Sequence, residues 1–175
     1  MDSKAIAKDI IDEVSSKVSE LKTNGWDPKL ISIKVGENQV VDLYIRNQRL
    51  KAEKIGIIFE EKEYPNEISA NELQAAIANF NVDPKVTGIF LQRPVPETLS
   101  IKTLQKAIHP LKDVEGMHPA SIGNIVYNEL ELGPCTAMAS VELLRRTGQD
   151  LKGLEVVVIG HSEIVGKPIA FLLMA

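Results

Sequence analysis

Glu155-Val-Val-Val-Ile-Gly-His-Ser-Glu-Ile-Val-Gly-Lys-Pro168 joins a β-branched apolar run to two glycines and a proline. The run at residues 156–159 predicts a strand buried on both faces of a parallel sheet. Pro168 suits the first turn of a helix, where its missing N–H costs nothing. A strand, a glycine loop and a helix N-terminus form a site where backbone N–H groups attract phosphate. The stretch therefore predicts the start of a dinucleotide-binding unit. Gly160 and Gly166 do not spell G-x-G-x-x-G, so an ordinary βα turn remains an alternative.

The composition is that of a soluble globular protein, with 44% apolar and 25% charged residues among 175. No apolar run approaches the length of a membrane span, and the N-terminus lacks the pattern of a signal peptide. The single cysteine, Cys135, cannot form an internal disulfide, so we expect a cytoplasmic location. The net charge of −4 gives no reason to expect nucleic acid as a partner. Because an apolar helical pattern is still running at Ala175, we expect the chain to be a fragment.

Helix and strand patterns alternate along the first two thirds of the chain. We expect helices at residues 3–21, from the loop 37–39 to about 54, after the Ser69–Glu72 capping box, and from Ser100 to about 107. Strands are expected at 30–35, 57–64 and 87–91, the second near a sheet edge because it becomes charged. The alternation predicts a three-layer α/β substrate domain with a mostly parallel sheet, followed by the start of a Rossmann-like nucleotide-binding domain.

The segment 109–134 is irregular and rich in Pro, Gly and Asn, and loops of this length are often functional. Thr136 is then expected to cap a helix that runs to about Arg146. We place the domain boundary in this helix or just before it. The predicted domains are residues 1–134 and residues 135–175, and we expect the second to be incomplete.

Two groups of polar residues follow predicted strands, at the carboxyl ends where open α/β sheets bind ligands. Tyr44 and Gln48 are four residues apart and share a helix face, although Tyr44 packed in the core and Gln48 on the surface is an alternative. Gln92-Arg-Pro-Val-Pro96 is a stiff loop in which Gln92 offers both a donor and an acceptor. A rigid turn without a ligand is the alternative for this loop.

A third group, Pro110-Leu-Lys-Asp-Val-Glu-Gly-Met-His118, places charged side chains beside a flexible glycine. Asp113 could hold an amino-pyrimidine ring through paired hydrogen bonds, and a solvated charged loop is the alternative. A metal site is disfavoured because only one histidine is present there. Cys135, in Gly133-Pro-Cys-Thr136, is expected to be a buried small residue rather than a nucleophile.

The order and spacing of these motifs resemble one family. Val35-Gly, Tyr44-Ile, Gln92-x-Pro-x-Pro, Lys112-Asp-Val-x-Gly, Pro134-Cys-Thr and Ile164-Val-Gly-Lys-Pro168 occur together in the bifunctional methylenetetrahydrofolate dehydrogenase/methenyltetrahydrofolate cyclohydrolase (FolD) family. The resemblance implies a cytoplasmic, homodimeric enzyme of one-carbon metabolism and purine biosynthesis. Such an enzyme oxidises 5,10-methylenetetrahydrofolate by hydride transfer to NADP and hydrolyses the methenyl product to 10-formyltetrahydrofolate. It implies no metal, no nucleic acid and no membrane partner.

The resemblance also implies roles for individual residues. The catalytic set is Tyr44, Gln48, Gln92 and Asp113, and Pro94 joins Tyr44, Gln92 and Asp113 in the substrate site. Tyr44 would stack on the aromatic part of the folate, Gln92 would lie beside the reacting carbon, and Asp113 would hold the pterin. The cofactor's phosphates would lie near the glycine loop, at Gly160, His161, Ser162, Ile164, Val165 and Gly166.

Two departures from the family pattern change these expectations. Gln48 stands where the family has a lysine, and a glutamine cannot exchange a proton. We therefore expect impaired cyclohydrolase activity and retained dehydrogenase activity. His161 stands where many members have arginine, which suits a 2′-phosphate better, so NAD is an alternative to NADP. A non-catalytic folate-binding paralogue or fragment is the alternative function, and a generic Rossmann-like interaction module is a third reading.

Overall fold

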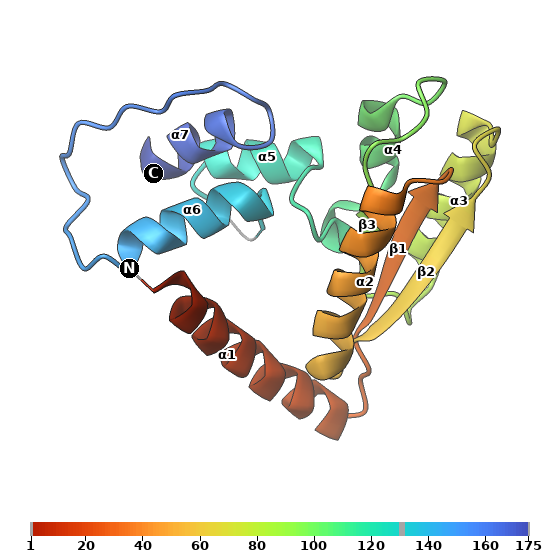
Figure 1. Ribbon diagram of the computed structural model, residues 1–175, viewed down its shortest axis with the longest axis horizontal. Helices are drawn as coiled ribbons and strands as arrows, with labels where there is room; N and C mark the ends of the chain where they lie inside the picture. The colour runs from red at the N-terminus through yellow and green to blue at the C-terminus, as the bar shows by residue number, and fades with distance from the viewer. Residues whose placement is uncertain (1, 130–131, 175) are drawn as a thin grey trace. The chain divides into compact units, whose positions relative to one another are not determined.

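The structure, a computed structural model, describes residues 2–129 and 132–174 (Figure 1). The chain divides into two compact units, which are considered separately below. Lys8–Val114 form the sheet unit. Met1–Ala7 together with Glu115–Ala175 form the helical unit.

The sheet unit is built on three parallel strands in the order β2-β1-β3 (Figure 1). The central strand β1 (Lys29–Val35) pairs with β2 (Ile58–Tyr64) along its whole length and with β3 (Gly88–Leu91) through four residues. All three strands were predicted, and the parallel sheet is confirmed. β2 forms one edge, as its charged second half indicates.

Helices cover both faces of this sheet because alternate residues of β1 point to opposite sides. Ile31, Ile33 and Val35 enter an apolar core with Leu73 of α3 (Ala70–Val82) and Leu104 of α4 (Ile101–Ala107). On the other face, Lys34 forms an ion pair with Asp42 of α2 (Gln39–Lys54). The predicted three-layer arrangement is therefore confirmed.

The helix ends in this part of the chain follow local sequence signals. α1 (Ser3–Thr23) stops before Gly25, which has a φ of 83°. The predicted capping box is present: Ser69 Oγ accepts a hydrogen bond from Glu72 N at 3.3 Å, and the Glu72 carboxylate accepts one from Ser69 N at 3.0 Å. Ser100 caps α4 by accepting a hydrogen bond on Oγ from Thr103 N, without the return bond of a capping box.

The segment 109–134 is more ordered than its composition indicates, so its reading as irregular is wrong in part. It contains the short 3₁₀ helix η1 (Pro110–Lys112) and the helix α5 (Pro119–Val126). His109 and His118 cap these helices, each accepting a hydrogen bond on Nδ1 from the N–H two residues later. The prediction missed them because both are short, and because proline at the first helical position was read as a loop signal.

Three helices of the helical unit pack on one another: α5, α6 (Cys135–Arg145) and α7 (Gly166–Met174) (Figure 1). Their shared core contains Ile125, Ala137, Val141 and Leu172. The prediction that Thr136 caps α6 is wrong. Pro134 occupies the N-cap position without a side-chain hydrogen bond, and Thr136 lies inside the first turn. Cys135 is exposed, so its predicted burial is also wrong.

The strand predicted at residues 156–159 is wrong as well. These residues make no β-ladder with any part of the chain that the structure describes, and Ile159 is 98% exposed. A strand requires a neighbouring backbone whose N–H and C=O groups complete the ladder. None of the described segments pairs with this one. The helix expected after it is present, with Pro168 in its first turn.

Candidate functional site

Gln92 is the centre of a small polar cluster at the carboxyl end of β3. Its side chain is only 3% exposed, and its backbone N–H donates to the carbonyl of Ile33 at 2.9 Å. Its Nε2 donates to Gln48 Oε1 at 2.7 Å and to Ser32 Oγ at 2.9 Å. The contact joins three elements: Ser32 lies in β1, Gln48 lies in α2, and Gln92 follows β3. The structure thus brings together two of the predicted catalytic residues.

Tyr44 lies one helical turn before Gln48 on α2, and its side chain is 55% exposed. The alternative in which Tyr44 packs in the core is therefore wrong. Ile45, the next residue, is buried instead. A half-exposed aromatic ring on the face that carries Gln48 is available to stack on a flat ligand.

Asp113 is almost completely buried and forms a parallel bridge with Ile89, three residues before Gln92. Asp113 therefore lies along the edge of β3 that β1 does not occupy. The alternative of a solvated loop is wrong for this residue. Pro94 is exposed and follows a cis peptide bond from Arg93. His118 and Glu115 belong to the helical unit.

Two polar residues of β1 were missed by the sequence analysis. Ser32 is fully buried and reaches Gln92, while Lys34 is buried between Asp42 and Glu63, the latter at 3.3 Å. The hydrogen bond that Lys34 Nζ donates to the Asp42 carboxylate raises the pKa of Lys34 above its usual value, against the effect of burial. Polar residues at alternate positions of an apolar strand were the available signal, since they share one face.

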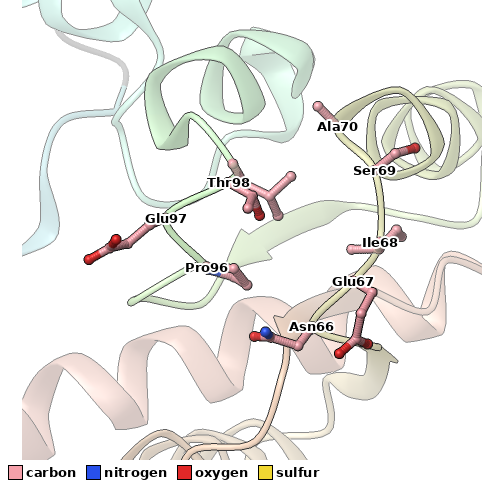
Figure 2. Close-up of a pocket in the computed structure, with 9 residues that line it drawn as sticks. Asn66, Glu67, Ile68, Ser69, Ala70, Pro96, Glu97 and Thr98 are labelled. Atoms are coloured by element: carbon pink, nitrogen blue, oxygen red, sulfur yellow. The ribbon is translucent and has the colours of Figure 1, made fainter.

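The sheet unit also contains a cavity of about 770 Å³ that none of the predicted site residues line. It lies between the connection that precedes α3 and the loop that precedes α4 (Figure 2). Its lining residues are Asn66, Glu67, Ile68, Ser69, Ala70, Pro96, Glu97, Thr98 and Leu99. Two carboxylates in this lining make it unsuited to an anion.

The predicted cofactor loop forms a tight turn at the start of α7. Ser162 Oγ accepts hydrogen bonds from Val165 N at 3.1 Å and Gly166 N at 3.4 Å, so Ser162 caps the helix. Gly166 has no space for a side chain, because a Cβ there would overlap the carbonyl oxygen of Gly160. His161 and Ile164 are exposed beside this turn. Residues 160–164 are thus exposed just before a helix N-terminus, where backbone N–H groups favour an anion.

Among the described residues, no group of three or more His, Cys, Asp or Glu side chains could hold a metal ion. No helix within residues 2–129 or 132–174 combines the length and apolar character needed to cross a membrane.

Comparison with known proteins gives two family matches that divide the chain. Residues 1–115 match "Tetrahydrofolate dehydrogenase/cyclohydrolase, catalytic domain", and residues 134–175 match the family's "NAD(P)-binding domain". The chain is 65% identical over 170 residues to "Bifunctional protein FolD 2" of Mesorhizobium japonicum, covering 97% of this chain and 56% of that protein. The chain thus spans a little over half the length of this curated relative.

Solved structures agree with these matches. The crystal structure of the bifunctional enzyme FolD from Campylobacter jejuni has a TM-score of 0.94 at 35% identity, covering 99% of this chain and 62% of that one. The Trypanosoma brucei enzyme complexed with NADP cofactor and inhibitor has a TM-score of 0.91 at 30% identity, covering 99% and 60%. On this combined sequence and structural similarity, the chain belongs to the tetrahydrofolate dehydrogenase/cyclohydrolase family.

Proposed function

We propose that this chain carries the folate site and the first part of the cofactor site of a methylenetetrahydrofolate dehydrogenase whose cyclohydrolase activity is impaired. The observation that carries the proposal is the contact between Gln48 and Gln92, at 2.7 Å. It joins two residues that the family resemblance assigns to catalysis, and one of them is a glutamine in place of the family's lysine. The protein would act in the cytoplasm, as a homodimer, on a folate and not on nucleic acid or a membrane.

The substrate-binding roles rest on burial and position in the sheet unit. The exposed ring of Tyr44 would stack on the aromatic part of the folate. Asp113, held beside β3, would bind the pterin through its carboxylate, and Pro94 would line the same site. Gln92 would contact the reacting carbon. The proposed domains are residues 1–134 and 135–175, and the family match that begins at residue 134 supports this division. The chain passes from one compact unit to the other between Ala7 and Lys8, and back between Val114 and Glu115.

The nicotinamide cofactor would supply the hydride acceptor. Its phosphate groups would lie at the turn formed by Gly160, His161, Ser162, Ile164, Val165 and Gly166, of which the first four are exposed. The NADP complex of the Trypanosoma brucei relative supports NADP. NAD is the alternative, because His161 is a weaker partner for a 2′-phosphate than an arginine. No residue of this proposed site requires a metal.

Gln48 decides which of the two activities persists. Hydride transfer needs an oriented substrate and no obligatory proton transfer, so a neutral glutamine can serve. Hydrolysis of the methenyl group needs an activated water and a proton relay. Loss of a general acid–base group lowers such a rate by about 10²–10⁴-fold.

Restoring the lysine tests the proposal. We expect Gln48→Lys to raise the rate of 5,10-methenyltetrahydrofolate hydrolysis by about 10²-fold or more, followed by the loss of methenyl absorbance. Gln39→Lys is the matched control, because it introduces the same charge at an exposed position of α2 away from Gln92. Equal rates in the two variants would contradict the role of Gln48.

A second candidate, a non-catalytic folate-binding protein, is favoured by the same substitution. It predicts folate binding without NAD(P)H formation from 5,10-methylenetetrahydrofolate. Measuring folate binding and NAD(P)H formation in a protein that contains this sequence distinguishes the two functions. Absence of folate binding would contradict both.

A further inference from the structure

We propose that Ser32 and Gln48 are positioning residues that hold the Gln92 amide with its carbonyl oxygen toward the ligand. This orientation would select folates that carry positive charge at the one-carbon bridge. The identity of the ligand rests on the proposed function, whereas the orientation of the Gln92 amide is independent of it.

The hydrogen bonds of Gln92 determine which end of its amide is available. A glutamine Nε2 has two N–H donors. One reaches Ser32 Oγ at 2.9 Å and the other reaches Gln48 Oε1 at 2.7 Å, so both donors are used. The carbonyl oxygen of Gln92 accepts no hydrogen bond from any described residue.

That carbonyl oxygen keeps some accessible surface even though the side chain is 3% exposed. Within the described residues, the one fully enclosed side-chain nitrogen or oxygen without a partner is Gln105 Nε2. Gln92 Oε1 is therefore not enclosed. A buried amide with one open polar atom can present only that atom, which is a hydrogen-bond acceptor.

The two partners of Gln92 fix this orientation from two different elements, β1 and α2. Ser32 is fully buried in the central strand, between Ile31 and Ile33, so its hydroxyl has a rigid position. Gln48 offers an oxygen from α2. A lysine at position 48 would have only donors, and it would draw the carbonyl oxygen of Gln92 toward itself. Glutamine at position 48 therefore accepts the hydrogen bond from Gln92, whereas a lysine would donate one to it.

The outward carbonyl oxygen carries partial negative charge on a side chain that is only 3% exposed. Positive charge on a nearby ligand is stabilised by such an oxygen. The bridge of 5,10-methenyltetrahydrofolate carries a delocalised positive charge, whereas 5-formyltetrahydrofolate is neutral at the corresponding carbon. The site should therefore prefer the methenyl cation.

The amide orientation can be measured without any folate. In the ¹⁵N-labelled chain, the side-chain amide signal of Gln92 is identified by its loss in Gln92→Glu. We expect Ser32→Ala to speed exchange of these amide protons with water by about five- to tenfold, because one hydrogen bond is lost. Ser32→Thr keeps the hydroxyl and should restore protection. Ser19→Ala, an exposed serine on α1, is the control and should change nothing. Unchanged exchange in Ser32→Ala would overturn the proposal.

A second variant covers the case in which Ser32→Ala does not fold. Gln48→Met removes the other acceptor at a half-buried helix position, and it should also speed exchange. Gln48→Glu keeps an acceptor oxygen and should preserve the protection. Equal exchange in these two variants would contradict the positioning role of Gln48.

Ligand selection is then tested by the ratio of two affinities, which general destabilisation would not alter. We expect the preference for 5,10-methenyltetrahydrofolate over 5-formyltetrahydrofolate to fall about five- to tenfold in Ser32→Ala and in Gln48→Met, and to be retained in Ser32→Thr. An unchanged ratio would overturn the selection role. If neither ligand binds the unmodified chain, the proposed function and the selection role fail together, while the amide exchange still decides the orientation.

Discussion

Two apolar runs of equal length, Gly88–Leu91 in the sheet unit and residues 156–159 in the helical unit, adopt different structures. Both precede polar loops that the family resemblance assigns to binding sites. The first is a buried strand that places Gln92 against Ser32 and Gln48. The second is exposed and unpaired within the described residues. A β-branched run shows that a segment can form a strand, and a neighbouring strand is what makes it one.

The comparison also separates two ways of building a site. The polar cluster around Gln92 depends on side chains from three elements, so the packed sheet sets its geometry. The turn around Ser162 is held by hydrogen bonds between residues three and four positions apart. It therefore forms without a strand before it. Substitutions in each region should reveal this difference.

The largest effect is expected in the packed core. Ile33 is completely buried in β1, and Ile33→Ala should lower the free energy of unfolding of the sheet unit by about 2–5 kcal/mol. Ile159→Ala removes the same atoms from an exposed residue, so it should change stability by less than about 0.5 kcal/mol. Urea unfolding followed by circular dichroism measures both. A comparable loss in the two variants would show that residues 156–159 are buried in solution.

An intermediate effect is expected at the glycine turn. Gly166→Ala places a methyl group against the carbonyl oxygen of Gly160 and should destabilise the packing of α7 by about 1–3 kcal/mol. Gly123→Ala, inside α5, is the matched control because open space surrounds its Cα. There the substitution should be neutral or stabilising by up to about 1 kcal/mol. Hydrogen exchange of the α7 amides checks this, and equal protection in both variants would contradict the close approach at Gly166.

The smallest effect is expected at the helix cap. Ser162→Ala removes the acceptor for Val165 N and Gly166 N, and should destabilise the start of α7 by about 0.5–2 kcal/mol. Ser140→Ala on α6 is the comparison, since that exposed hydroxyl bonds only to the Thr136 carbonyl within its own helix. Its effect should be close to zero. Exchange rates of the first α7 amides distinguish the two, and no change in Ser162→Ala would remove the capping role.

Sequence patterns predicted the sheet unit well. The three strands, α1, α2 and the Ser69–Glu72 capping box followed from periodicity and local hydrogen-bonding groups. Predictions failed where signals were short or where a neighbour was required. The short helices η1 and α5 were missed, Thr136 proved to lie inside α6, and the expected strand at 156–159 has no ladder. Ser32 was overlooked because a serine in an apolar strand has no evident partner until the sheet is assembled.

The sequence by itself thus predicts helix caps, turns and amphipathic faces, because each of these involves residues only a few positions apart. The order of motifs also places the chain in its family. Only the tertiary structure determined that Gln92 contacts Gln48, 44 residues earlier, and Ser32, 60 residues earlier. Those contacts depend on the register of β1 with β3 and on the packing of α2 against the sheet. Hydrogen bonds between residues far apart in the sequence form only when the fold brings their elements together. An apolar run likewise becomes a strand only when another strand lies beside it.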